Sequence, residues 1–323
     1  MQIKLSNPRG FCAGVHMAVD IIDLLLDGLE SEEELYVYHE IVHNRHVVER
    51  LRERGAIFVD TIAEIPEGSI VVFSAHGVSP AVKEEAADRH LKCIDATCPL
   101  VTKVHAEAIR YEKRGWQIIL IGHRNHQEVV GTQGEAPNAI QVVESPSDIP
   151  SLYIDDPDKL VYLTQTTLSI EDAEIIISAL KAAFPTIHAP PSDDICYATT
   201  NRQIAVRDDA ASADLVLVVG SNNSSNSLRL TEIAHSVGTP AHLLDDVTYL
   251  QETWLDGVET VLITAGASAP EHLVLEIVDH LVKHHDGELQ DESTIDEGMS
   301  FSIPPTVTSF LELRNITVEG KSK

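Results

Sequence analysis

Three of the four cysteines in this 323-residue chain stand between a loop and a pattern typical of a helix. Cys12, Cys98 and Cys196 open the segments FCAGVHMAVDIIDLLL, TCPLVTKVHAEAIRYEKRG and ICYATTNRQIAVRDDAA. The N-terminus of a helix favours a thiolate, because its free N–H groups carry partial positive charge. Three thiolates can hold a zinc ion that keeps one water, or a cubane iron–sulfur cluster in which one iron lacks a cysteine. The spacing of the cysteines does not choose between these two metals.

Polar loops recur at similar distances after each of these cysteines. The first loops lie 28 to 31 residues after the cysteine and the second loops 64 to 72 residues after it, at His43, His126 and Asn226 and at His76, Thr166 and Ser268. Imidazole, hydroxyl and amide donors, together with helix-terminal N–H groups, are what a buried diphosphate needs. The run SNNSSNS, which includes Ser224 and Ser225, is on its own equally typical of a turn with a helix cap.

Glu128, two residues after His126 in HRNHQEV, is the candidate acid. A carboxylic acid beside an open iron could deliver protons to a leaving hydroxyl. Most glutamates are instead exposed surface residues, so this role depends on where the fold places Glu128.

Other reactive residue types are predicted to have no chemical role. HEIVH at 39–43 matches a zinc-protease pattern, but LYVY leads into it as a strand, and a helix is predicted only after Asn44. Cys93 lies between Leu91 and Ile94, which predicts a packed core residue. The histidines of VDHLVKHHDGE are expected to be solvated. The sequence contains neither GxGxxG nor GxxxxGK[ST], so electrons would have to come from another protein.

These residues need a framework of strands and helices to bring them together. Short β-branched runs precede each polar loop, as buried parallel strands do, and ligands gather at the carboxyl ends of such strands. The runs are LYVY, SIVVF, QIILI, LVYLT, LVLVV and TVLIT. Ser79, Ser169 and Ser268 are predicted N-caps of the helices after the second loops. The sequence therefore predicts three α/β units that face one another, with the cysteines at the centre.

Composition excludes some classes of partner. Lys and Arg number 23 against 51 Asp and Glu, a net charge of −28, which repels nucleic acid and anionic membrane surfaces. The N-terminus MQIKLSNPRG lacks the pattern of a signal peptide, and IIDLLLDGL is too short to span a bilayer. We therefore expect a cytoplasmic protein.

Eight motifs in order closely resemble the LytB-type 4-hydroxy-3-methylbut-2-enyl diphosphate reductases, over roughly residues 1–280. They are NPRGFCAGV, HEIVHN, FSAHGVS, DATCPLVTKVH, TQTTLS, DDICYATTNRQ, VVGSNNSSNS and TAGASAPE. The resemblance implies an α/β fold, a trefoil of three pseudo-threefold-related domains around a central [4Fe–4S] cluster. The expected domains are 14–97, 98–193 and 1–13 plus 194–281. The tail, 282–323, is expected to form a strand or a lid over the core.

The resemblance also implies the reaction and its residues. The family removes the allylic hydroxyl of (E)-4-hydroxy-3-methylbut-2-enyl diphosphate, which binds the open iron, with two electrons and two protons from outside. The products are isopentenyl and dimethylallyl diphosphates, and the electron donors are ferredoxin or flavodoxin. The implied cluster ligands are Cys12, Cys98 and Cys196, while Glu128 serves the proton path. The implied substrate-binding residues are His43, His76, His126, Thr166, Ser224, Ser225, Asn226 and Ser268.

Two other functions remain open on the residues alone. A non-enzymatic iron–sulfur carrier would need neither an acid nor an anion pocket, and it would prefer four cysteines. A zinc-dependent hydrolase would use the same three thiolates. Metal content and substrate-dependent electron transfer distinguish the three.

Overall fold

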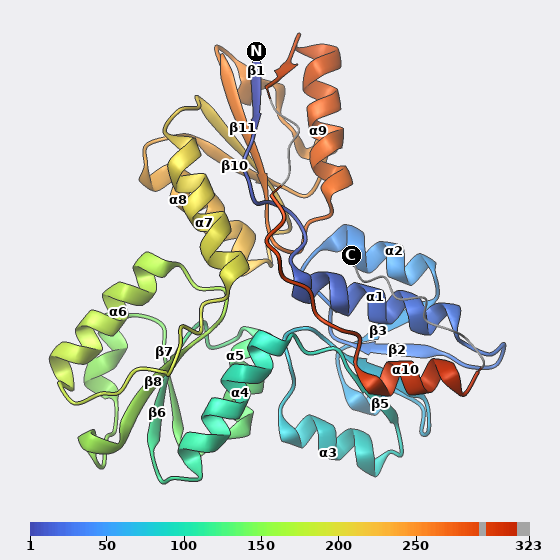
Figure 1. The fold of residues 1–323 in the computed structure, drawn as a ribbon, viewed down its shortest axis with the longest axis vertical. Coiled ribbons are helices and arrows are strands. Elements are labelled where there is room, and N and C mark those ends of the chain that lie inside the picture. The colour runs from blue at the N-terminus through green and yellow to red at the C-terminus, as the bar shows by residue number, and fades with distance from the viewer. Residues whose placement is uncertain (291–294, 315–323) are drawn as a thin grey trace.

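Three separate β-sheets, each flanked by helices, make up the computed structural model of this chain, which describes residues 1–290 and 295–314. Each sheet belongs to one lobe, and the three lobes meet at the centre of the molecule (Figure 1). The strand pairs in all three sheets are parallel. The predicted α/β trefoil is therefore confirmed.

The first unit has a four-stranded sheet in the order β3-β2-β4-β5. Its β4 is buried along its whole length, which explains why this strand is a continuous apolar run in the sequence. The elements of this unit are α1 (Ala13–Asp27), β2 (Leu35–Tyr38), α2 (Arg45–Glu53), β3 (Ala56–Val59), the 3-10 helix η1 (Ile62–Glu64), β4 (Ile70–Phe73), α3 (Pro80–Asp88) and β5 (Lys92–Asp95).

The second unit has a three-stranded sheet in the order β7-β6-β8, and β8 is again fully buried. A single bridge from Val161 to His188 adds a short fourth position beside β8. The elements are α4 (Pro99–Glu112), β6 (Gln117–Ile121), α5 (Gln127–Glu135), β7 (Ile140–Val143), η2 (Pro146–Ser151), η3 (Pro157–Lys159), β8 (Leu160–Thr164) and α6 (Ile170–Ala183).

The third unit is assembled from both ends of the chain, in a five-stranded sheet of order β10-β9-β11-β1-β12. The elements are β1 (Gln2–Leu5), α7 (Tyr197–Ala210), β9 (Leu215–Val219), α8 (Ser225–Ser236), β10 (Ala241–Leu244), η4 (Val247–Tyr249), η5 (Glu252–Leu255), β11 (Thr260–Ala265), α9 (Glu271–His284) and β12 (Glu288–Leu289). The chain thus leaves this sheet through β1 and enters the first unit at α1. The sequence boundaries given above for the domains stay a prediction.

The tail crosses from the third unit to the first, shown in red in Figure 1. After β12 pairs with β1, Glu297 binds the guanidinium of Arg202 at 3.1 Å. The helix α10 (Pro305–Glu312) then buries Val307 and Leu311 in the core around α1. The predicted strand is therefore present at β12, whereas the helix that packs on the first unit was not predicted.

Two sequence predictions are wrong. Cys93 is exposed, because β5 is an edge strand in which Ile94 alone is buried. Ser268 is not an N-cap, because α9 begins one turn later behind Pro270; its hydroxyl donates instead to the carbonyl oxygen of His43, at 2.8 Å. Ser79 and Ser169 do cap α3 and α6 as predicted. None of the helices in residues 1–290 and 295–314 has the length and apolar character needed to cross a membrane.

Candidate functional site

The three predicted ligand cysteines open into one cavity at the centre of the trefoil, with a volume of about 100 Å³. Cys12, Cys98 and Cys196 are the N-caps of α1, α4 and α7, as their place in the sequence predicted. Each unit therefore brings one sulfur to the cavity at the start of its first helix.

A cyclic set of backbone hydrogen bonds holds the cysteines at the junctions between units. The N–H of Cys98 donates to the carbonyl oxygen of Ala75 in the first unit, at 3.0 Å. The N–H of Cys196 donates to Thr166 in the second unit, at 3.0 Å, and that of Cys12 to Ala267 in the third, at 3.1 Å. Each cysteine is thus anchored to the second polar loop of the preceding unit, which is the geometric content of the threefold repeat.

Gly14 allows two of these sulfurs to approach each other. A Cβ atom on Gly14 would lie 2.6 Å from the sulfur of Cys98 and 3.9 Å from that of Cys12. The two sulfurs are therefore separated by no more than the sum of these distances, 6.5 Å. The N–H of Ala13 also donates to the hydroxyl of Tyr197 at 3.2 Å, which joins the starts of α1 and α7. Any side chain at position 14 would occupy the space between the sulfurs.

Burial keeps these thiols protonated in the absence of a metal. It raises the pKa of Cys98 to about 12 and that of Cys196 to about 11, and it also raises the pKa of Cys12. The expectation that helix N-termini would favour thiolates describes a real but smaller effect, since backbone N–H groups lower the pKa values less than burial raises them. A bound cation would supply the positive charge that thiolates need here.

Glu128 is buried at the start of α5, with only 2% of its surface exposed. Its Oε1 accepts a hydrogen bond from the N–H of Thr166 at 2.6 Å, and its Oε2 accepts one from the Thr166 hydroxyl at 3.0 Å. Burial raises the pKa of Glu128 to about 7, although both hydrogen bonds oppose the shift. The carboxyl can therefore both hold and release a proton near neutral pH.

Three histidines form a cluster on the same cavity. The rings of His43 and His76 stack with centroids 4.1 Å apart, and His126 lies 5.4 Å and 5.8 Å from them. Burial lowers the pKa of His126 to about 3 and that of His76 well below its usual range. His126 Nδ1 accepts from the N–H of Glu128 at 3.2 Å, so the proton of its neutral ring sits on Nε2. The cluster therefore presents uncharged N–H donors.

Hydroxyl and amide groups of the third unit also line the cavity. Ser224 caps α8, and Ser225 donates to the carbonyl oxygen of Thr167 at 3.3 Å. Asn226 accepts from the N–H of Ala267 at 2.9 Å, which holds the loop that carries Ser268. The first turn of α8 thus brings backbone N–H groups to the cavity, as an anion site requires.

Thr199 is a cavity residue that the sequence reasoning missed. Its hydroxyl lies 3.1 Å from the sulfur of Cys196, and its N–H donates to that sulfur at 3.4 Å. Asn226 Nδ2 donates to the same hydroxyl at 3.4 Å. The available signal was its position three residues after Cys196, where the N–H of a helix meets its N-cap side chain.

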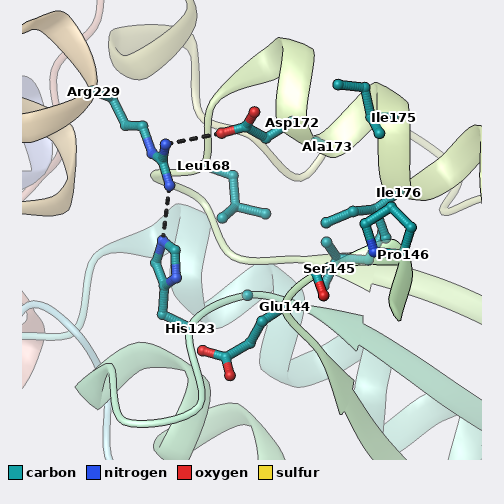
Figure 2. A pocket seen from close by; sticks show the side chains of 12 residues that line it. His123, Glu144, Ser145, Pro146, Leu168, Asp172, Ala173, Ile175, Ile176 and Arg229 are labelled. Atoms are coloured by element: carbon teal, nitrogen blue, oxygen red, sulfur yellow. Dashed lines mark hydrogen bonds and ion pairs between the residues drawn. The ribbon is translucent and has the colours of Figure 1, made fainter. Parts of the chain in front are cut away.

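A second hollow, of about 180 Å³, lies between the second and third units (Figure 2). Arg229 reaches into it from α8, binding Asp172 at 2.8 Å and approaching His123 Nε2 at 3.3 Å. Its charged groups are thus engaged with each other across the junction. It holds no cysteine, so the central cavity is the candidate active site.

Comparisons with known proteins agree with this geometry. A sequence model of the family described as LytB protein matches residues 3–282. A 4-hydroxy-3-methylbut-2-enyl diphosphate reductase of Idiomarina loihiensis is 52% identical over 94% of this chain and 98% of its own length. One from Sodalis glossinidius is 55% identical over 87% and 89% of the two chains. The solved E-1-hydroxy-2-methyl-but-2-enyl-4-diphosphate reductase of Plasmodium falciparum superposes with a TM-score of 0.92, at 38% identity, over 97% of this chain and 98% of that one. The chain therefore belongs to the LytB family of 4-hydroxy-3-methylbut-2-enyl diphosphate reductases.

Proposed function

We propose that this chain converts (E)-4-hydroxy-3-methylbut-2-enyl diphosphate, two electrons and two protons into water and isopentenyl or dimethylallyl diphosphate. The allylic C–O bond breaks, and a C–H bond forms at one end of the allylic system. The observation that carries the proposal is the convergence, in one buried cavity, of three cysteines, a carboxyl with a pKa of about 7 and neutral histidine donors. A carrier needs only the first of these.

The residues at the cavity fit a [4Fe–4S] cluster held by Cys12, Cys98 and Cys196. The sulfurs come from three helix starts, and Gly14 leaves the space between two of them free. The fourth cysteine, Cys93, is exposed on the edge strand β5, so it cannot serve as a further ligand at this cavity. A cluster with three cysteine ligands would supply the electrons, one at a time, and keep one iron without a cysteine.

The diphosphate would be bound by neutral donors rather than by lysine or arginine. His43, His76 and His126 offer imidazole N–H groups on one side of the cavity. Ser224, Ser225, Asn226 and Ser268 offer hydroxyl and amide groups on the other, together with the N-terminus of α8. In a dry cavity, such donors bind an anion strongly because water does not compete for them.

Glu128 would hold the proton for the leaving hydroxyl, and Thr166 would orient it. The two hydrogen bonds from Thr166 fix both carboxylate oxygens. The same Thr166 accepts the N–H of Cys196 at its carbonyl oxygen, so the acid and one cluster ligand share a single anchor. Proton delivery would therefore occur at a fixed distance from the reducing group.

The electrons would come from ferredoxin or flavodoxin, because the sequence has no motif for a nucleotide or flavin. The test is oxidation of a chemically reduced dye by the anaerobically purified protein, with and without the allylic diphosphate. We expect substrate-dependent oxidation and release of the two isomeric diphosphates. Dye oxidation that does not depend on substrate would indicate a carrier. Zinc in place of iron, with hydrolysis of the diphosphate, would indicate a hydrolase.

A further inference from the structure

A second group of metal-ligating side chains lies in the third unit, outside the central cavity. Glu252 in η5, His280 in α9 and His285 just after α9 each place one ligand atom within 4.8 Å of the other two. His285 Nε2 is 3.1 Å from Glu252 Oε2, and His280 Nε2 is 3.5 Å from Glu252 Oε1. The sequence analysis expected these histidines to be solvated, but the two side chains are only 27% and 21% exposed.

The two ring nitrogens that face the carboxylate are buried and make no hydrogen bond among the described residues. Buried polar atoms in folded proteins are nearly always hydrogen-bonded, and an unpaired one is unfavourable. In a tetrahedral site with ligand bonds of 2.0–2.1 Å, neighbouring ligand atoms are about 3.4 Å apart. The two nitrogen–oxygen distances, 3.1 and 3.5 Å, lie on either side of that value.

Hydrophobic packing brings the three ligands together. Leu255 in η5 and Leu281 in α9 are both buried in the core of the third unit, which holds η5 against the end of the helix. This end of α9 carries the partial negative charge of the helix dipole, which favours a cation. The 14 residues of α9 place the group about 20 Å from the helix start beside the central cavity, so the two sites are distinct.

We propose that Glu252, His280 and His285 bind one divalent transition-metal ion of the zinc type, with water completing its coordination. Two imidazole nitrogens and one carboxylate oxygen are a ligand set that zinc accepts. The ion joins η5 to the C-terminal end of α9 and so stabilises the sheet from which β11 and β1 lead to the cavity. The proposal does not depend on the function proposed for that cavity.

The test uses the anaerobically purified protein with its cluster in place, so that Cys12, Cys98 and Cys196 are occupied. Zn²⁺ is titrated by calorimetry, and the zinc X-ray absorption spectrum reports its neighbours. We expect one Zn²⁺ per chain, surrounded only by nitrogen and oxygen at about 2.0–2.1 Å. Zn²⁺ should also raise the melting temperature. The double variant His280→Ala/His285→Ala should bind at least about 100-fold more weakly and lose the thermal shift.

His235→Ala is the matched control, since His235 is an exposed histidine at the end of another helix of the same unit, α8. It should bind Zn²⁺ as the unchanged protein does. Equal binding by the double variant, or a sulfur neighbour at about 2.3 Å, would overturn the proposal. If the double variant does not fold, His285→Asn replaces it, and unchanged affinity in that variant has the same meaning. Because zinc binding is measured without turnover, failure of the proposed reaction would leave this result unaffected.

Discussion

The second and third units meet the central cavity with the same backbone arrangement and different chemistry. Each starts a helix at a cysteine, Cys98 or Cys196, and each starts a second helix at the cavity after its first buried strand. The second residue of that second helix is Glu128 in α5 and Asn226 in α8. By helix position, Glu128 rather than His126 therefore corresponds to Asn226, although counting from the cysteines paired the latter two.

This difference separates two tasks in one cavity. Glu128 is an acid that burial holds near neutral pKa, whereas Asn226 is an uncharged group that binds the loop at Ala267. A carboxylate at both positions would put two negative charges around an anionic substrate. The repeat thus supplies equivalent positions, and one residue in each first turn decides whether that side of the cavity donates protons or binds the anion.

The strongest test concerns what the two units share. Cys98→Ser and Cys196→Ser should each lose the cluster and all turnover, because each removes one of three sulfur ligands. Iron content and visible absorbance after anaerobic reconstitution measure the loss. If either variant kept full iron content, that cysteine would not be a ligand and the equivalence of the units would fail.

The next test concerns the acid. Glu128→Gln keeps the shape of the side chain and can still accept a hydrogen bond from Thr166, but it cannot deliver a proton. We expect an intact cluster and a fall in kcat of at least about 100-fold, the usual contribution of a general acid. In the unchanged protein, kcat should decline as pH rises through about 7, where Glu128 loses its proton. Near-normal turnover in Glu128→Gln would remove this residue from the proton path.

Burial of Glu128 should also make stability depend on pH. Its pKa rises from 4.5 to about 7 on folding, so the folded protein holds the proton more tightly than the unfolded chain. The free energy of unfolding should therefore be highest below pH 4.5 with respect to this group and fall by about 3 kcal/mol as pH rises past 7. Glu128→Gln should lack this fall. Urea unfolding of both proteins, cluster-free and fully reduced, at pH 5 and pH 8 measures the difference, and parallel behaviour would contradict it.

A smaller effect is expected on the other side of the cavity. Asn226→Ala removes the acceptor for Ala267 and one donor for the anion. We expect KM to rise about 10-fold, the value of one hydrogen bond to a charged group, with kcat changed less. Steady-state kinetics with the allylic diphosphate separate the two constants. A loss confined to kcat would mean that the two units do not divide the tasks as described.

The smallest effect is expected at Cys93. Cys93→Ser alters an exposed residue of an edge strand and should leave iron content, absorbance and turnover unchanged. It serves as the control for the ligand variants, since it makes the same chemical change five residues from Cys98. Bleaching of this variant would require a different ligand assignment.

The features that the sequence alone determined are local ones. Apolar runs predicted the buried strands β2, β4, β6, β8, β9 and β11, and loop-to-helix transitions predicted that the three cysteines begin helices. Both signals depend on neighbouring residues, which is why they can be found without a structure. Where a local signal was read too far, as at Cys93 and Ser268, an edge strand or a proline overrode it.

The chemical state of the site was decided only by the tertiary structure. The pKa of Glu128 and of the three thiols depends on burial by residues from different units, to which no local pattern responds. The same holds for Thr199, which becomes a cavity residue only when α7 meets α8, and for the pairing of Glu252 with His280 and His285. Desolvation and charge interactions are sums over neighbours in space, whereas a sequence shows only neighbours along the chain.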